Sequence, residues 1–173
     1  MTKEQLSEEY RWLTRNRLHP EFSKRAEIYN EIIINTMAVW HEQPHTIEMR
    51  EEWFSQKKEQ GFPVLVAELQ GLVVGFSTIA TFRPWSGFRF TVENSVYVRP
   101  ENRGQGVAKL LLPALIDAAK QLNIHAIVAG IEATNEVSIS LHEKFGFIEV
   151  AHFKEVGFKF GRWMDLKFLE LIL

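Results

Sequence analysis

A glutamate and a glycine-containing loop lie close together in the stretch VENSVYVRPENRGQGVAKLLL, residues 92–112. Glu93 belongs to a β-branched run, where a carboxylate with a raised pKa can accept a proton from a nucleophile. Gly104 and Gly106 directly precede an apolar helical pattern. The backbone N–H groups of residues 104–109 then converge at the start of a helix, which is an arrangement that binds phosphate. The stretch therefore combines a candidate base with a candidate phosphate site.

Both features also have a purely structural interpretation. Two glycines before a helix can serve only the turn, and a glutamate in a strand can face solvent from a sheet edge. The loop is not a P-loop, because no Gly-Lys-Ser/Thr follows, and it lacks the third glycine of the dinucleotide fingerprint. Strand alternation places Glu93 on one face with Thr91, Ser95 and Tyr97. The surrounding sequence has to decide between these interpretations.

Composition excludes several classes of function. The net charge is -2 and the basic residues are scattered, so we expect no nucleic-acid partner. The chain has no cysteine, which excludes disulfides, thiolate ligands and a cysteine nucleophile, and we expect no metal site. No stretch approaches the roughly 20 apolar residues of a membrane span, and the N-terminal MTKEQLSEEYRW does not resemble a signal peptide. We therefore expect a soluble cytoplasmic protein without a membrane partner.

Apolar residues at spacings of three and four predict four helices. Thr46 caps the second helix, whose predicted inner face includes Met49. Pro113 bends the third helix, whose apolar stripe extends to Leu122. Gly146 ends the fourth. The predicted helices cover residues 26–37, 46–61, 107–122 and 136–145.

Runs of β-branched residues predict the strands. Gln70 and Gly71 join the first two strands in a tight hairpin. The apolar run IHAIVAGI is typical of a strand that is buried on both faces of a sheet. No repeat or linker divides the chain, so we expect one domain over 1–173, in which 1–25 form an unassigned N-terminal arm. The predicted strands cover residues 63–69, 72–81, 91–98, 124–131, 147–156 and 164–172.

The motifs resemble those of a known family. RGQGVA, preceded by VYVRP, is similar to the Arg/Gln-x-x-Gly-x-Gly/Ala signature of the GNAT superfamily of N-acetyltransferases, with Arg103, Gly106 and Ala108 at the signature positions. TVENSVYV, NEVSISLHEKFGF and EVGFKFGRWMDLKF resemble the phosphinothricin and methionine-sulfoximine acetyltransferase branch. The resemblance covers residues 26–173. It implies an α/β fold with a central mixed, mostly antiparallel, twisted sheet flanked by helices, acetyl-CoA as cofactor and an amine acceptor.

The resemblance also implies a cofactor site. The strand backbone at Val96 to Val98 would bind the pantetheine arm, and the Val98 N–H would stabilise the oxyanion. The N–H groups of residues 104–109 would bind the pyrophosphate with help from the helix dipole and from Arg103. Asn135 would contact the arm, cap its helix, or do both. The expected cofactor-binding residues are Val96, Tyr97, Val98, Arg103, Gly104, Gln105, Gly106, Val107, Ala108, Lys109, Asn135 and Ser138.

Glu93 is the expected general base, and His142 is the second catalytic candidate. Helical spacing turns His142 inward, where it is either the active-site histidine that the resemblance implies or a core histidine. The family tyrosine that protonates the leaving thiolate has no counterpart, because Phe145 and Phe147 stand at the available positions. The acid is therefore unassigned, although a thiolate with a pKa of about 8.5 leaves without assistance.

The acceptor is expected to lie against the loop FRPWSGFRF, residues 82–90. The segment between Trp85 and Glu93 is shorter than in herbicide-detoxifying members of the branch, so the acceptor pocket is expected to differ. A guanidinium in this loop can pair a substrate carboxylate or phosphinate, although loop packing would explain the same residues. The run 158–163 either completes the pocket or forms a dimer contact. The expected substrate-binding residues are Arg83, Trp85, Glu93, Asn94 and Ser95.

The sequence thus predicts an acetyl-CoA-dependent N-acetyltransferase that forms a homodimer. Its predicted acceptor is the α-amine of methionine sulfoximine, methionine sulfone, phosphinothricin or a similar small molecule, which is a detoxification reaction. Direct attack in a ternary complex is favoured because no cysteine nucleophile exists. The alternatives are another amine, such as a polyamine, an aminoglycoside or a protein N-terminus, and a non-catalytic acyl-CoA-binding module.

Overall fold

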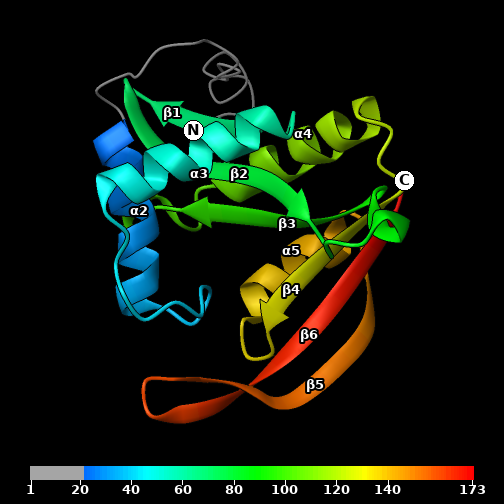
Figure 1. Ribbon diagram of the computed structural model, residues 1–173. Coiled ribbons are helices and arrows are strands. Elements are labelled where there is room, and N and C mark those ends of the chain that lie inside the picture. The colour runs from blue at the N-terminus through cyan, green and yellow to red at the C-terminus, as the bar shows by residue number, and fades with distance from the viewer. Residues whose placement is uncertain (1–21) are drawn as a thin grey trace.

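A six-stranded sheet with helices on both faces forms the part of the chain that the computed structural model describes, residues 22–173 (Figure 1). The strand order is β1-β2-β3-β4-β6-β5, and the β3–β4 pair is parallel while the others are antiparallel. The predicted α/β fold with a mostly antiparallel sheet is confirmed. The elements are α2 (Phe22–Asn35), α3 (Ile47–Glu59), β1 (Val64–Leu69), β2 (Leu72–Thr81), the 3-10 turn η1 (Ser86–Phe88), β3 (Thr91–Val98), the 3-10 turn η2 (Pro100–Asn102), α4 (Val107–Gln121), β4 (Ala126–Glu132), α5 (Glu136–Lys144), β5 (Ile148–Lys159) and β6 (Arg162–Ile172).

Helix α3 begins at the predicted cap, but it buries a different face. The Oγ1 atom of Thr46 accepts the N–H of Met49 at 3.3 Å. Met49 itself is 47% exposed, whereas Arg50 is buried, so the predicted inner face is wrong at this position. The Arg50 guanidinium lies 4.2 Å from the ring centroid of Tyr29 and 4.0 Å from that of Trp53. These aromatic faces favour the cation inside the fold and outweigh the helical periodicity.

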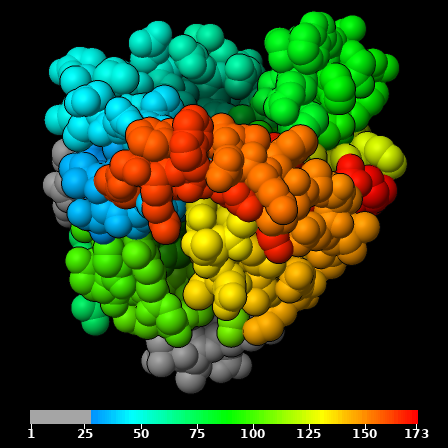
Figure 2. Space-filling model, turned by 90° about the horizontal axis from the view of Figure 1, so that it is seen from below, coloured from blue at the N-terminus to red at the C-terminus, as the bar shows by residue number. Residues whose placement is uncertain are grey.

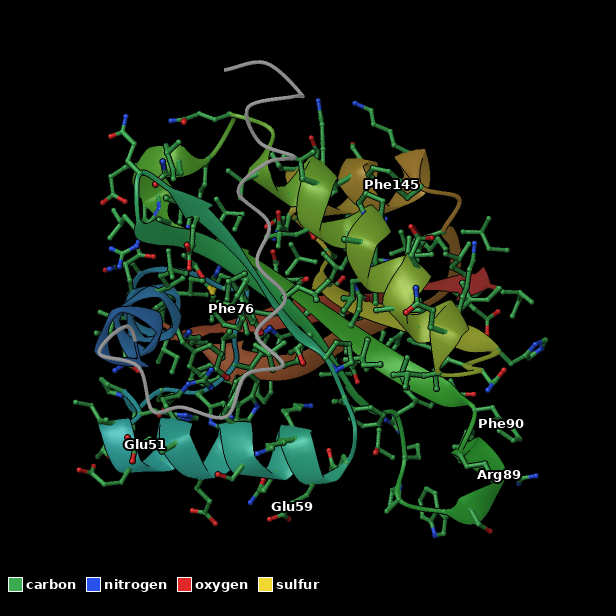
Figure 3. The ribbon with its side chains drawn as sticks, turned by 90° about the horizontal axis from the view of Figure 1, so that it is seen from above. Glu51, Glu59, Phe76, Arg89, Phe90 and Phe145 are labelled. Atoms are coloured by element: carbon green, nitrogen blue, oxygen red, sulfur yellow. The ribbon has the colours of Figure 1, made fainter. Side chains whose placement is uncertain are left out.

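The two faces of the sheet carry separate apolar clusters. Helices α4 and α5 cover one face, and α2 and α3 cover the other; Figure 3 shows Phe76 on the side of α2 and α3 and Phe145 on the side of α4 and α5. Helix α4 continues through Pro113 and ends at Gln121. Leu122 was predicted to belong to the buried apolar stripe, but it is 41% exposed, so the prediction is wrong at this residue. The buried residues of α4 are Val107, Leu111, Leu112, Leu115, Ile116, Ala118 and Ala119.

The hairpin of β5 and β6 reaches back to the end of α2. Its tip lies across the early part of the chain in Figure 2. Lys159, at the end of β5, is 1% exposed, and its Nζ donates to the carbonyl oxygens of Ile33, Thr36 and Val39 at 2.6, 2.8 and 2.6 Å. The carbonyls at the end of a helix have no helical partners, so one ammonium group satisfies the C-terminal end of α2 and the turn after it.

The predictions also covered the N-terminal arm and the absence of a membrane span. The unassigned arm falls almost entirely on residues 1–21, which lie outside the described part. Within residues 22–173, none of the helices has the length and apolar character needed to cross a membrane.

Candidate active site

Strands β3 and β4 separate after a short parallel ladder. β3 pairs with β2 from Val92 to Val98, but it pairs with β4 only from Thr91 to Glu93. Beyond this ladder the two strands diverge (Figure 1), and Figure 2 shows a hollow between the start of α4 and β4. The edge of β3 that faces β4 is therefore open over residues 94–98.

The open edge of β3 presents the backbone N–H groups of Val96 and Val98. Arg99 donates its N–H to the carbonyl of Val74 at 2.8 Å, so the odd-numbered residues of β3 bond toward β2. Because the N–H groups of a strand alternate in direction, the even-numbered ones point toward the gap. The Val98 carbonyl accordingly accepts from Arg103 Nε at 3.2 Å instead of from β2.

Two left-handed glycines lead into α4. Gly104 has φ +74° and Gly106 has φ +90°, and a Cβ at either position would meet no atom within 4 Å. These glycines therefore permit a backbone turn and keep its surface open; they do not make room for a neighbouring side chain. The N–H of Lys109 reaches the Gly106 carbonyl at 3.0 Å, which leaves Val107 and Ala108 in the first turn, where N–H groups have no helical acceptor.

Glu93 fills the space left by a missing side chain on β4. It lies opposite Val128 in the parallel ladder, and a Cβ built on Gly130 would lie 2.9 Å from Glu93 Oε1. Gly130 is exposed in a strand whose other residues are buried. Burial raises the pKa of Glu93, and the nearby positive charge of Arg83 lowers it in part. The site thus holds a carboxylate of raised pKa beside an opening in the sheet.

Aromatic rings surround this opening. Phe168 Cε1 would lie 3.3 Å from the same Cβ on Gly130, and the Phe168 ring contacts Phe82 and Phe153 edge-on with centroids 6.4 and 5.8 Å apart. Phe88 contacts Phe82 at 5.7 Å, which joins the loop 82–90 to this wall. Sequence reasoning missed Gly130 and Phe168, although a glycine inside an apolar strand is a signal of close approach.

The loop 82–90 projects from the molecule near this wall, as the labelled Arg89 and Phe90 show in Figure 3. The Arg83 guanidinium lies 4.1 Å from the Phe82 ring centroid and donates to the Phe82 carbonyl at 2.7 Å. Trp85 is 67% exposed, with its ring 6.3 Å from that of Phe88. Of the two predicted acceptor contacts, Arg83 is close enough for its charge to act on the Glu93 carboxyl, and Trp85 stands at the outer surface.

His142 faces inward as predicted, but it does not meet Glu93. Its side chain is 4% exposed and contacts Asn94 on the α5 side of the sheet. Glu93 precedes Asn94 in the strand, so the two side chains leave opposite faces. On the Glu93 face, the Tyr97 hydroxyl shares a hydrogen bond with Ser95, and burial raises the pKa of Tyr97.

The other predicted cofactor residues are arranged around the start of two helices. Asn135 caps α5, with Oδ1 accepting the N–H of Ser138 at 3.2 Å, so its capping role is confirmed. The Arg103 side chain turns to the Val98 carbonyl, and the Gln105 Nε2 donates to the Glu101 carbonyl at 2.8 Å.

Comparison with known proteins identifies the family. A family model described as an acetyltransferase (GNAT) domain matches residues 10–167. The chain belongs to the GNAT family of acetyltransferases. The L-amino acid N-acyltransferase MnaT of Escherichia coli is 45% identical over 148 residues, covering 86% of each chain. An L-methionine sulfoximine/L-methionine sulfone acetyltransferase of Pseudomonas aeruginosa is 46% identical over 147 residues, covering 84% of this chain and 86% of the relative.

A solved GNAT structure shows the same fold with its cofactor. The protein yncA of Salmonella typhimurium, solved with acetyl-CoA, superposes with a TM-score of 0.90 at 40% identity and covers 95% of this chain and 92% of its own. This chain is an acyltransferase that uses acetyl-CoA. Its residues fit that cofactor, because the open turn at Gly104 and Gly106 leaves space for a diphosphate. The N–H groups of Val96 and Val98 offer matching donors for an extended amide arm.

Proposed function

We propose that this GNAT enzyme transfers an acetyl group to the α-amine of a small amino-acid-like acceptor such as methionine sulfoximine or methionine sulfone, with phosphinothricin as a further candidate. The names of the relatives support an amino-acid acceptor. The single observation that carries the proposal is the half-buried Glu93 carboxylate beside the exposed Gly130, with the positive charge of Arg83 acting on it. An α-amino acid offers an amine for the carboxylate and a carboxylate for the guanidinium.

The residues around Glu93 can perform the transfer by direct attack. Acetyl-CoA, when bound, supplies a thioester whose carbonyl carbon is the electrophile. Glu93 takes one proton from the acceptor ammonium, directly or through a water, and so frees the amine lone pair. The Val98 N–H donates to the carbonyl oxygen as negative charge develops there. The C–N bond would form as the C–S bond of the thioester breaks. Glu93 passes the first proton to solvent or to the leaving thiolate. It can then take the second proton, which the nitrogen must lose to become an amide.

Arg83 is the proposed anchor of the acceptor carboxylate. It stacks on Phe82 in the exposed loop and lies close enough to Glu93 to lower the pKa of that carboxyl. A guanidinium on a ring is held in one plane, which favours bidentate pairing with a carboxylate. An acceptor whose amine and carboxylate share one carbon would therefore bridge Arg83 and Glu93.

The proposed dimer rests on the apolar surface of the β5–β6 hairpin, which forms one edge of the sheet. Large apolar side chains of this hairpin are half exposed, which is typical of an interaction surface. Light scattering of the wild type and of Trp163→Lys tests this proposal, and a monomeric wild type contradicts it. We further propose that each chain forms a single domain and that the protein acts in the cytoplasm. The exposed side chains are Ile148 64%, Val150 50%, Phe153 48%, Val156 49%, Phe158 51%, Phe160 55% and Trp163 62%.

The decisive experiment measures release of free thiol from acetyl-CoA with a panel of amines. The panel contains methionine sulfoximine, methionine sulfone, phosphinothricin, a polyamine, an aminoglycoside and a peptide with a free N-terminus. We expect the amino-acid analogues to give the highest kcat/KM and Arg83→Gln to raise their KM more than that of the polyamine. Highest activity on a non-amino-acid amine refutes the acceptor proposal, and cofactor binding without turnover on any amine favours a non-catalytic module.

A further inference from the structure

His142 and Asn94 form a buried polar pair between α5 and β3. Their side chains are 4% and 7% exposed, and His142 Nε2 lies 2.9 Å from Asn94 Nδ2. The other ring nitrogen, Nδ1, lies 2.8 Å from the backbone carbonyl oxygen of Ser138. A carbonyl oxygen only accepts hydrogen bonds, so Nδ1 carries the ring hydrogen. Burial lowers the pKa of His142, which keeps the ring neutral near neutral pH and leaves Nε2 as an acceptor.

The tautomer of His142 fixes the orientation of the Asn94 amide. Because Nε2 accepts, the amide must turn its NH2 group toward the ring and its Oδ1 away from it. The Oδ1 atom is buried and has no hydrogen-bond donor among the groups of the described structure. A buried acceptor without a donor destabilises the folded state. The described part of the chain therefore holds this oxygen in place without supplying it a donor.

The unpaired oxygen belongs to the residue at which β3 and β4 part. The last ladder pair is Glu93 with Val128, and Asn94 is the next residue of β3. The Asn94 side chain lies on the face of α5, whose N-cap is Asn135. Ligand atoms that enter the gap between the strands from the cradle at α4 would pass between β3 and the start of α5. The part of acetyl-CoA that would lie along an open strand edge is its extended amide arm.

We propose that Asn94 and His142 form a positioning pair for the pantetheine arm of acetyl-CoA, in which Asn94 Oδ1 accepts a hydrogen bond from an amide N–H of the arm and His142 holds the Asn94 amide in the orientation that permits it. The inference rests on the proposed function, in which acetyl-CoA binds along the open edge of β3. It assigns His142 no proton transfer, since the lone pair of Nε2 is already used by Asn94. Glu93, on the other face, remains the base.

The test uses a double variant that removes both polar partners. Asn94→Leu together with His142→Phe replaces the pair by apolar groups of similar shape, a change that can be nearly neutral for stability. We expect the melting temperature of the free double variant to stay close to that of the wild type. Isothermal titration with CoA should show about tenfold weaker binding, the loss expected for one hydrogen bond to a buried acceptor.

A second ligand distinguishes an effect on binding of the pantetheine arm from an effect on the rest of the cofactor site. The nucleotide 3′-phosphoadenosine 5′-diphosphate carries the diphosphate but no pantetheine amide, so its affinity should be the same for the wild type and the double variant. CoA affinity within about twofold of wild type overturns the proposal. Equal losses for CoA and the nucleotide also overturn it, because the variant would then disturb the whole site. Unchanged CoA affinity with a raised acceptor KM means that the N–H donor is the acceptor amine, and this too refutes the assignment. None of these binding outcomes depends on which amine is the acceptor.

Discussion

Gly130→Ala should lower the activity of the enzyme without lowering its stability. The new Cβ would lie 2.9 Å from Glu93 Oε1 and 3.3 Å from Phe168 Cε1, whereas ordinary contacts begin at 3.4 Å. The carboxylate must therefore retreat by about half an ångström, since Oε1 is the free end of a flexible side chain and the backbone of β4 is not. A displacement of 1 Å at a reacting group can cost about 100-fold in rate, so this smaller shift should lower kcat by about tenfold.

The same substitution should leave the fold intact. The backbone of Gly130 is not in the left-handed region, so alanine is not strained there. Replacing glycine where the native conformation allows it stabilises by about 0.4–1 kcal/mol through the unfolded state, which offsets the crowding at Glu93. We expect a melting temperature within a few degrees of wild type and unchanged affinity for CoA. Thiol-release kinetics, thermal unfolding and CoA titration measure the three quantities.

Two glycines serve as controls for this experiment. Gly87→Ala places a Cβ with no atom within 4 Å and controls for the general effect of a glycine substitution on stability. Gly75→Ala places a Cβ 2.8 Å from the backbone oxygen of Tyr97, which cannot retreat, and should lower the melting temperature. A Gly130→Ala enzyme with kcat within about twofold of wild type refutes the assignment of Glu93 as base. A loss of kcat that accompanies an equal loss of folded protein refutes it as well.

Three further predictions follow from other sites. Burial raises the pKa of Glu93 above 4.5, so the folded state favours the protonated carboxyl. The stability of the fold should therefore fall as pH rises from 4.5 through the pKa of the folded state. Over the same pH range kcat/KM should fall as pH is lowered, because the base becomes protonated. Glu93→Gln should accordingly lose about 100-fold or more in kcat and gain stability at neutral pH; a variant that loses both contradicts the argument. Gly106→Ala and Gly71→Ala force alanine to φ +90° and +76° in open space, so urea titration should show similar costs of about 1–2 kcal/mol. Only Gly106→Ala should weaken the binding of CoA, by about tenfold. Equal CoA affinities of the Gly106→Ala and Gly71→Ala variants would mean that Gly106 serves the fold alone. Lys159→Met leaves three carbonyls without their donor and should lower the free energy of unfolding by about 2–3 kcal/mol, whereas the exposed Lys154→Met should change it little.

Local signals in the sequence predicted much of the framework. Thr46 and Asn135 cap their helices with the expected side-chain bonds, because a cap involves residues only three positions apart. Gln70 and Gly71 both have positive φ, at 53° and 76°, as the tight hairpin requires. Strand β3 spans the predicted residues 91–98, since its β-branched alternation is regular. These features depend on neighbours along the chain, so one sequence suffices to find them.

The features that sequence reasoning missed depend on residues far apart in the chain. The approach of Glu93 to Gly130 is set by the register of β3 with β4, which a helix separates in the sequence. The burial of Arg50 depends on the ring of Tyr29 in another helix. Strand β5 extends to Lys159, beyond the predicted end at residue 156, and its pairing with β6 is irregular at residues 149–151 and 153–157, where bulges depend on the partner strand.

The position of β6 limits how this enzyme can be made in the cell. β6 is the last strand in the sequence, yet it lies inside the sheet between β4 and β5 and pairs with both. During translation, β4 and β5 therefore have no common neighbour until β6 has left the ribosome. The sheet closes only when β6 has been inserted, so a nascent chain that stalls within β6 exposes an unpaired edge of β4. Substitutions that disrupt β6 should for this reason be more harmful than equivalent substitutions in an outer strand.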